Sequence, residues 1–450
     1  MNTRVQIRVL VLAALIAPSL SCSKGGDPIR DEGADAALPG RVQRDLTDTA
    51  PADAAAAADA AAGGCAHPLP AGWPASFALY PYSPILRPTP SSSNQGADNI
   101  YAPEIHARSG AKVMWYGAQG LDGHDRIYLA WSRDGMAWTK WPSDSAPAPV
   151  LDRGASNHVN DPSVVRPAGT WRMYYTDAAT AENDEIWLAE SSKLTGFTKV
   201  QRVLEKGPPG AWDDEKVGRP SVLYEGGVYF MWYDGTSKGR RHVGLATSTD
   251  GLRFTRAPQN PVFRDAGAVD VKRVGGTLVM LREAADGTYF ATSTDGICWI
   301  DRGRLFGLSG SDYDRYGQVT PFLEIDSSAG GGAVVGVWFG GASVATWNKN
   351  RIAAAFPKGT IPSGGGCTEC VTPGLSCTSA CQRGGLGSAG LCASPGSTLP
   401  GSCCACQPSG CDACAAKGDC QAACVGSGQA GGWCAYPGST MPGRCCACIE

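Results

Sequence analysis

This sequence of 450 residues has a small net charge, few histidines and no long apolar run. These features argue against a nucleic-acid-binding protein, a metal site and a membrane-spanning helix, respectively. The formal net charge is −3 with no basic face, which argues against a nucleic-acid partner. The N-terminal apolar run, residues 9–17, is much shorter than the roughly 20 residues that a membrane-spanning helix needs. Histidines number only five. We expect no metal site and no cofactor.

The N-terminal segment has the features of an export signal, because Arg4 and Arg8 precede the apolar run. Residues 19–22 (Ser-Leu-Ser-Cys) then resemble the cleavage site of bacterial lipoproteins. This resemblance implies a signal peptide over residues 1–22 and a lipid on Cys22, which would anchor the protein, as a monomer, to the outer membrane or cell surface. The alternative is an ordinary cleaved signal with an incidental cysteine, and both alternatives predict export.

Residues 23–64 are rich in Ala, Asp and Gly and contain no aromatic residue, so they lack the material for a core. This composition predicts a disordered tether between the signal peptide and the first folded domain.

The middle of the chain repeats one unit. The phrase Met-Trp-Tyr or Met-Tyr-Tyr begins at Met114, Met173 and Met231, which are 59 and 58 residues apart, and each copy begins 11 residues after a proline. Two weaker copies follow before residue 340. In the clearest copy, residues 218–254, β-branched and alternating segments predict three antiparallel strands joined by glycine-containing turns.

Most copies close with a Ser-x-Asp-Gly turn, at Asp134, Asp250 and Asp295, and one further strand follows each turn. Four strands at this period are typical of a β-propeller blade. Residues 77–86 repeat the last strand before the first copy begins, so we expect them to complete the fifth blade and close the ring. The sequence therefore predicts an all-β protein with a five-bladed β-propeller over residues 65–358.

The chain has 19 cysteines, and 16 of them lie after residue 366. This density indicates an oxidising compartment. Cys65 lies just before the closing strand and Cys298 lies at a blade turn, which suggests a disulfide that pins the N-terminal segment.

The tail contains two repeats of eight cysteines each, over residues 367–406 and 411–448. Units of about 40 residues bury too little apolar surface to fold on burial alone, so we expect disulfides to stabilise them. Zinc binding by the CxxC and CxC spacings is the alternative, although the tail has no histidine.

The loops that lead into the innermost strands of a propeller converge at one mouth of its channel. Side chains just before each repeat proline are therefore the candidates for binding a ligand. They are Asp98, His158, Asn160, Trp212, Asp214, Arg219, Asp270, Tyr316 and Gln318. Trp212 could stack on a sugar ring, whereas Trp115 and Trp232 are better explained by packing between blades. His158 could bind substrate or cap its loop.

Asn160-Asp161-Pro162, Arg219-Pro220 and the Met-Trp-Tyr strands resemble the five-bladed propeller superfamily of arabinanases, β-xylosidases, invertases and levansucrases. The resemblance covers about residues 75–357. It implies a glycoside hydrolase with one acidic residue from each of the first three blades at the mouth, because one carboxyl must donate a proton while another stays ionised.

Carried onto this sequence, the resemblance implies catalytic roles for Asp161, Glu104 and Glu215. Asp161 matches the carboxylate that tunes the acid, although Asp-Pro can also be a turn device. Blade one has Ala102 where the family has an acid, so Glu104 or Asp98 would replace it. In blade three Arg219 occupies the family's place and Glu215 lies upstream.

Two functions follow from these residues. The first is an exported hydrolase that acts on glycosidic bonds of a polysaccharide or oligosaccharide. The second is a glycan-binding or surface-interaction protein that kept the propeller and lost its acids, with the cysteine repeats as a stalk or adhesion module.

Overall fold

The computed structural model describes residues 65, 67–89, 99–108, 110–180, 183–326, 332–360, 389–392, 404–407, 420–434 and 446–449. The signal peptide, Cys22, the tether, Asp98 and most of the first cysteine repeat lie outside these residues. Within the described ranges, no helix is long and apolar enough to cross a membrane.

The described residues between 77 and 357 form five antiparallel sheets, one in each blade, and a single pair, Ala284 with Gln318, joins the fourth and fifth into one continuous sheet. The first sheet contains β2 (Asn99–Arg108), β3 (Ala111–Gln119), β4 (Asp125–Ser132) and β5 (Thr139–Lys140), with β6 (Pro149–Leu151) also paired to β4. The second contains β7 (His158–Val165), β8 (Trp171–Ala178), β9 (Asp184–Ser191) and β10 (Thr198–Leu204). The third contains β11 (Lys216–Glu225), β12 (Val228–Ser237), β13 (Arg240–Ser248) and β14 (Thr255–Arg256). The fourth contains β15 (Asp270–Val274), β16 (Thr277–Ala284), β17 (Gly287–Ser293) and β18 (Ile300–Gly307). The fifth contains β19 (Gln318–Asp326), β20 (Ala333–Ala342), β21 (Asn350–Pro357) and β1 (Phe77–Leu79).

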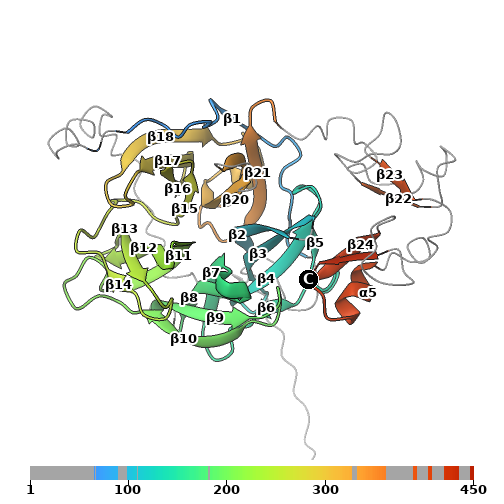
Figure 1. Cartoon of the computed structure of the whole chain (residues 1–450), viewed down its shortest axis with the longest axis horizontal. Coiled ribbons are helices and arrows are strands. Elements are labelled where there is room, and N and C mark those ends of the chain that lie inside the picture. The colour runs from blue at the N-terminus through green and yellow to red at the C-terminus, as the bar shows by residue number, and fades with distance from the viewer. Residues whose placement is uncertain are drawn as a thin grey trace, which may run out of the picture. The chain divides into compact units, whose positions relative to one another are not determined.

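The innermost strands of successive sheets contact one another around a closed ring. β2 contacts β7, β7 contacts β11, β11 contacts β15, β15 contacts β19, and β19 contacts β2. Figure 1 shows the five sheets arranged around a common centre. This is the all-β, five-bladed propeller that the repeat predicts.

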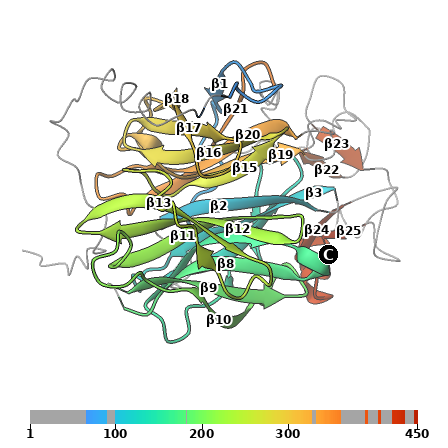
Figure 2. The ribbon, with the colours of Figure 1, turned by 60° about the vertical axis from the view of Figure 1, so that its left-hand side comes forward.

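The N-terminal strand closes the fifth sheet, as the sequence predicts. Phe77 pairs with Pro357, and Leu86 forms a further bridge with Ile352. Figure 2 shows β1 beside β21. Pairing strands from the two ends of the propeller removes an exposed sheet edge.

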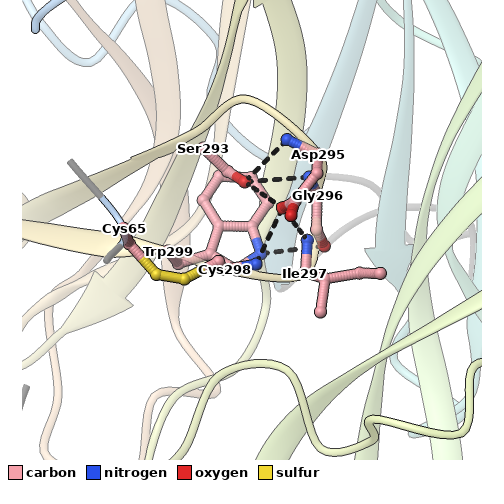
Figure 3. The surroundings of a disulfide bond; sticks show 7 residues. All are labelled: Cys65, Ser293, Asp295, Gly296, Ile297, Cys298 and Trp299. Carbon is pink, nitrogen blue, oxygen red and sulfur yellow. Dashed lines mark hydrogen bonds between the residues drawn. A yellow bond between two sulfur atoms is a disulfide. The ribbon is translucent and has the colours of Figure 1, made fainter. Parts of the chain in front are cut away.

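A disulfide joins Cys65 to Cys298, with their Cα atoms 6.0 Å apart, so this prediction is also confirmed (Figure 3). The turn beside it is held by side chains. Asp295 Oδ1 accepts hydrogen bonds from the backbone N–H groups of Ile297 and Cys298, at 2.9 and 2.8 Å. Asp134 and Asp250 accept the same pair of bonds in their own turns, which is the structural role predicted for them.

Large aromatic side chains fill the spaces between blades. Trp115 and Trp232 are almost fully buried, and their indole N–H groups donate to Leu194 O and Gly296 O on neighbouring blades, each at 3.0 Å. Both tryptophans therefore pack between blades, as expected.

The strand that follows the Asp250 turn in blade three is short. It stops at Arg256, and Phe263 forms only an isolated bridge to Val243. Asn260 supplies the missing pairing with its side chain, which bonds both the N–H and the C=O of Leu245, at 2.7 and 2.9 Å.

The second cysteine repeat contains helix α5 (Cys420–Gly426) and a hairpin of β24 (Gly431–Cys434) and β25 (Cys446–Ile449). Disulfides join Cys420 to Cys446 and Cys424 to Cys448, so these four cysteines are paired as the disulfide interpretation predicts. In the first repeat, β22 (Ala389–Cys392) and β23 (Cys404–Gln407) form a hairpin with the corresponding register.

Candidate functional site

A cavity opens to solvent where the five innermost strands converge, and the empty space in it and at its mouth is about 340 Å³. Its walls are the residues around the repeat proline of four blades and the equivalent residues of blade four, which has no proline there. They are Ala102, Pro103, Glu104, Asp161, Pro162, Arg219, Pro220, Ala268, Val269, Asp270, Thr320, Pro321 and Phe322. In four of the five blades the repeat proline is thus also a marker of the cavity wall.

One residue per blade in this wall has a left-handed backbone. The five residues are Ala102, Asp161, Arg219, Ala268 and Thr320, with φ between 46° and 51°. Four of them coincide with a register shift between the first two strands of their blade. Left-handed φ costs a residue other than glycine about 1–2 kcal/mol, so each bulge must be held by its surroundings.

Hydrogen bonds between neighbouring blades hold these bulges. The N–H of Arg219 donates to Thr176 Oγ1 at 2.8 Å, and the N–H of Ala268 donates to Asp234 Oδ1 at 2.9 Å. The N–H of Thr320 donates to Glu283 Oε2 at 3.1 Å. The ring closes where the N–H of Ala102 donates to Thr320 Oγ1 at 2.8 Å. Four of the five left-handed residues therefore donate their amide N–H to the adjacent blade, and all five line the cavity.

Charged side chains form a chain of ion pairs along one side of the cavity. Arg219 lies 3.8 Å from Asp161 and 3.4 Å from Asp234, measured between nitrogen and oxygen. Arg241 continues the chain, 3.6 Å from Asp234 and 2.5 Å from Glu283. Burial raises the pKa of Asp234, while Arg241 and Arg219 oppose that rise. Burial disfavours the charge on Arg219, but Asp161 and Asp234 outweigh it and raise the pKa of Arg219.

A second charged group lines the other side of the cavity. Asp270 lies 2.6 Å from Lys272 and accepts the N–H of Leu323 at 2.8 Å. Burial and the nearby charge of Glu104 raise the pKa of Asp270, and Lys272 opposes them. Glu104 itself lies 2.8 Å from the Nε2 atom of His106. Both carboxylates are therefore already engaged with neighbours.

The structure brings together some of the residues suggested as catalytic. Glu104 and Asp161 both line the cavity, as do Arg219 and Asp270. Glu215 does not line it; its side chain is exposed and accepts the N–H groups of Lys238 and Gly239, at 2.8 and 3.3 Å.

Three of the suggested binding residues hold their loops by hydrogen bonds. The N–H of Asp125 donates to His158 Nδ1 at 3.0 Å, and Asn160 donates to the hydroxyl of Tyr101 at 3.1 Å. Asp214 accepts the N–H of Gly210 at 2.7 Å, a bond that lowers the pKa of Asp214. None of these three lines the described cavity.

The remaining three also lie outside the cavity wall. Trp212 packs on its own blade, 5.7 Å from the ring of Tyr233, where a side chain at Gly235 would clash with it. Gln318 is fully buried and accepts the hydroxyl of Thr288 at 2.8 Å. Tyr316 is 39% exposed.

Several residues of the site escaped the sequence analysis. Asp234 and Arg241 lie on second and third strands, away from the repeat proline, and Thr320 precedes a proline but carries no charge. Its position directly before Pro321 is the one feature of the sequence that could have identified Thr320 as a residue of the site. Among the described residues, no group of three or more acidic, cysteine or histidine side chains could hold a metal ion.

No family model matches this sequence. Two uncharacterized proteins from strains of Mycobacterium tuberculosis are 31% identical to it over 153 residues, which is 32% of this chain and 49% of each of theirs. The chain thus spans about half the length of the curated relatives that it matches.

Solved structures share the fold. A glycoside hydrolase has a TM-score of 0.50 at 19% identity, covering 61% of this chain and 90% of that one. A family 117 glycoside hydrolase from the marine bacterium Zobellia galactanivorans has a TM-score of 0.50 at 16% identity, covering 62% and 90%. A glycosyl hydrolase from Bacteroides ovatus has a TM-score of 0.50 at 17% identity, covering 64% and 95%. The propeller of this protein therefore has a glycoside hydrolase-like fold.

Proposed function

We propose that this protein binds a glycan at the central cavity and does not hydrolyse it. The observation that carries this proposal is the position of Arg219, which stands between Asp161 and Asp234. The family resemblance calls for an acid on blade three, close to that position. A guanidinium stays protonated in proteins, so Arg219 cannot replace that acid as a proton donor.

The other carboxylates of the wall support the same conclusion. A glycosidase needs one carboxyl that can donate a proton and one ionised carboxylate that can attack or activate water. Asp270 is engaged by Lys272 and by the N–H of Leu323. Glu104 is engaged by His106. A polar, shaped cavity whose carboxylates are engaged in this way is suited to hold sugar hydroxyl groups.

Hydrolysis is the second candidate, because three carboxylates from three blades line one cavity: Glu104, Asp161 and Asp270. In this alternative Asp161 and Glu104 keep the roles that the resemblance gives them. The raised pKa of Asp270, caused by burial and by Glu104, would then serve proton donation. Glu215 would need to move from its exposed turn to take part.

Binding and turnover can be measured on the same samples. The probes are arabino-, xylo- and manno-oligosaccharides for calorimetry, and aryl glycosides of the same sugars for turnover. We expect binding without turnover, and we expect Asp161→Asn to change the affinity only modestly. Glu215→Gln is the matched control and should change neither quantity. Turnover that Asp161→Asn abolishes would favour the hydrolase, and absence of both binding and turnover would overturn the proposed function.

We further propose that the protein is exported and held at the cell envelope, as a monomer, by a lipid on Cys22. The disulfides between Cys65 and Cys298 and within the second cysteine repeat support an oxidising compartment. Cys22→Ala should move the protein from the membrane fraction to the soluble exported fraction. Unchanged fractionation would support the ordinary cleaved signal.

A further inference from the structure

Trp347 lies beside the cavity, in the loop between β20 and β21 of blade five. It packs against Tyr101, Ala102, Val319 and Ala342, and Ala102 is part of the cavity wall. The tryptophan side chain is only half-buried. A large apolar ring is therefore presented next to a small alanine at the edge of the polar cavity.

The backbone of Trp347 is left-handed, with φ of 57°, which a bulky side chain rarely adopts. Such conformations persist only where the surroundings impose them, and they concentrate at functional sites. This conformation lies outside the ring of five bulges, so the repeat does not account for it.

The loop is fixed by hydrogen bonds at both ends and at the ring. Ser343 Oγ donates to Lys349 O at 2.6 Å, and Asn350 Nδ2 donates to Trp347 O at 2.7 Å. The indole N–H of Trp347 donates to Tyr316 O at 2.7 Å. The ring is thus oriented before any ligand arrives, which reduces the entropy lost on binding.

We infer that Trp347 is the platform on which a neutral pyranose or furanose ring stacks at the cavity; this inference rests on the proposed function. A sugar ring has one face of C–H groups and an edge of hydroxyl groups. The indole face of Trp347 is suited to pack on the C–H face of the sugar. Asp161, Arg219 and Thr320 in the wall are suited to hydrogen-bond its hydroxyl groups.

The charge of the wall selects a neutral sugar over an acidic one. The wall contains three carboxylates, Glu104, Asp161 and Asp270, and one guanidinium, Arg219, while Lys272 pairs with Asp270. That guanidinium already lies beside Asp161 and Asp234. A uronate would therefore bring a negative charge to a negative surface.

The test uses the full-length protein and calorimetry with neutral arabino-, xylo- and manno-oligosaccharides and with oligogalacturonate. We expect Trp347→Ala to weaken binding of the neutral ligand about tenfold or more, and Trp347→Phe to retain most of the affinity. Tyr224→Ala is the matched control, because Tyr224 is 41% exposed and outside the cavity wall, and it should bind as the wild type does. Oligogalacturonate should bind more weakly than the neutral ligand.

The outcomes separate this inference from the proposed function. If the wild type binds a neutral oligosaccharide and Trp347→Ala binds it equally well, the platform is refuted while the proposed function stands. Tighter binding of oligogalacturonate would refute the neutral ligand class. If no probe binds the wild type, both the proposed function and this inference fail.

A second measurement covers the case in which Trp347→Ala is unstable. With 5-fluorotryptophan incorporated into the wild type, the resonance assigned to position 347 through Trp347→Phe should shift on addition of the bound sugar. A resonance that does not move while calorimetry reports binding would overturn the inference.

Discussion

Arg219 is the residue on which the charge balance of the cavity depends, since it lies within 4 Å of carboxylates from two blades. Replacing it by methionine should preserve most of its apolar packing but leave Asp161 and Asp234 with less positive charge. We expect the free energy of unfolding to fall by about 3 kcal/mol, because a buried ion pair is costly to break on one side. Guanidinium denaturation measures this, and Arg253→Met at an exposed position is the control.

The same variant should have an altered pH dependence. Burial already raises the pKa of Asp234, and loss of Arg219 removes one of the two cations that oppose the rise. A carboxyl whose pKa is higher in the folded state makes the protein lose stability as the pH rises from its unfolded pKa through its folded pKa. The melting temperature of Arg219→Met should therefore lie closer to that of the wild type at pH 4.5 than at pH 8. An equal deficit at both values would contradict the role given to Asp234.

At the scale of elements, one side-chain hydroxyl links the last blade to the first. Thr320 in β19 accepts the N–H of Ala102 in β2 at 2.8 Å, across 218 residues of sequence. Thr320→Val should leave that buried N–H unsatisfied and cost about 1–3 kcal/mol. Thr320→Ser, which keeps the hydroxyl, should lose much less in the same denaturation experiment. Equal losses would mean that shape, and not the hydrogen bond, matters at this junction.

The disulfide and the closing strand β1 both attach the N-terminal segment to the propeller. Cys65 and Cys298 are separated by 233 residues, so their bond restricts the unfolded chain strongly. Replacing both by serine should lower the free energy of unfolding by about 2–5 kcal/mol. Denaturation of the double variant, compared with each single variant, checks this. A stability equal to that of the wild type would show that β1 is held by its pairing and packing alone.

Sequence patterns recovered the elements better than the site. Spacing between prolines and Met-Trp-Tyr strands reports a backbone period, so the blades, the closing strand and the Cys65–Cys298 bond could be predicted. The ion pairs of Asp234 and Arg241 join different strands and blades, and no local period encodes them. Left-handed residues such as Ala102 and Thr320 also escaped, because neither residue type signals positive φ. Glu215 was suggested because it is an acidic residue upstream of the proline of blade three. Its position in the sequence does not reveal that its carboxylate accepts the N–H groups of a turn.

At the scale of the whole molecule, the second cysteine repeat contacts blade one. The indole N–H of Trp131 donates to Gln421 Oε1 at 2.7 Å, and the rings of Trp131 and Trp433 are 5.9 Å apart. Trp131 pairs with Val113 and thus lies level with His106, several residues along the strands from the cavity at Ala102. The contact therefore lies away from the cavity wall at Ala102.

The hairpins of the two repeats pair in the same register but carry different residues at these contact positions. Equivalent register positions place Leu391 where the second repeat has Trp433, and Gln407 where it has Ile449. The aromatic and aliphatic residues that join the propeller core are thus replaced in the first repeat. The two repeats have diverged in the surface that meets blade one.

Reduction should separate the tail from the propeller. The stability of the second repeat depends on its disulfides, whereas the stability of the blades depends on buried aromatic and aliphatic side chains. Under mild reduction we expect a protease to remove residues 367–450 while the far-ultraviolet circular dichroism of the propeller persists. The Cys65→Ser/Cys298→Ser variant should release its tail at the same reductant concentration. Loss of the propeller signal together with the tail would contradict this division.

The pairing of β1 with β21 also determines when the protein can finish folding. Residues 77–79 are synthesised early, yet their partners at 355–357 emerge from the ribosome almost 280 residues later. The ring therefore stays open until then. The propeller also suits circular permutation: the N–H of Lys358 donates to Ser76 O at 2.9 Å, so a short linker could join the chain at these residues while new termini open at Gly226–Gly227, the turn between β11 and β12.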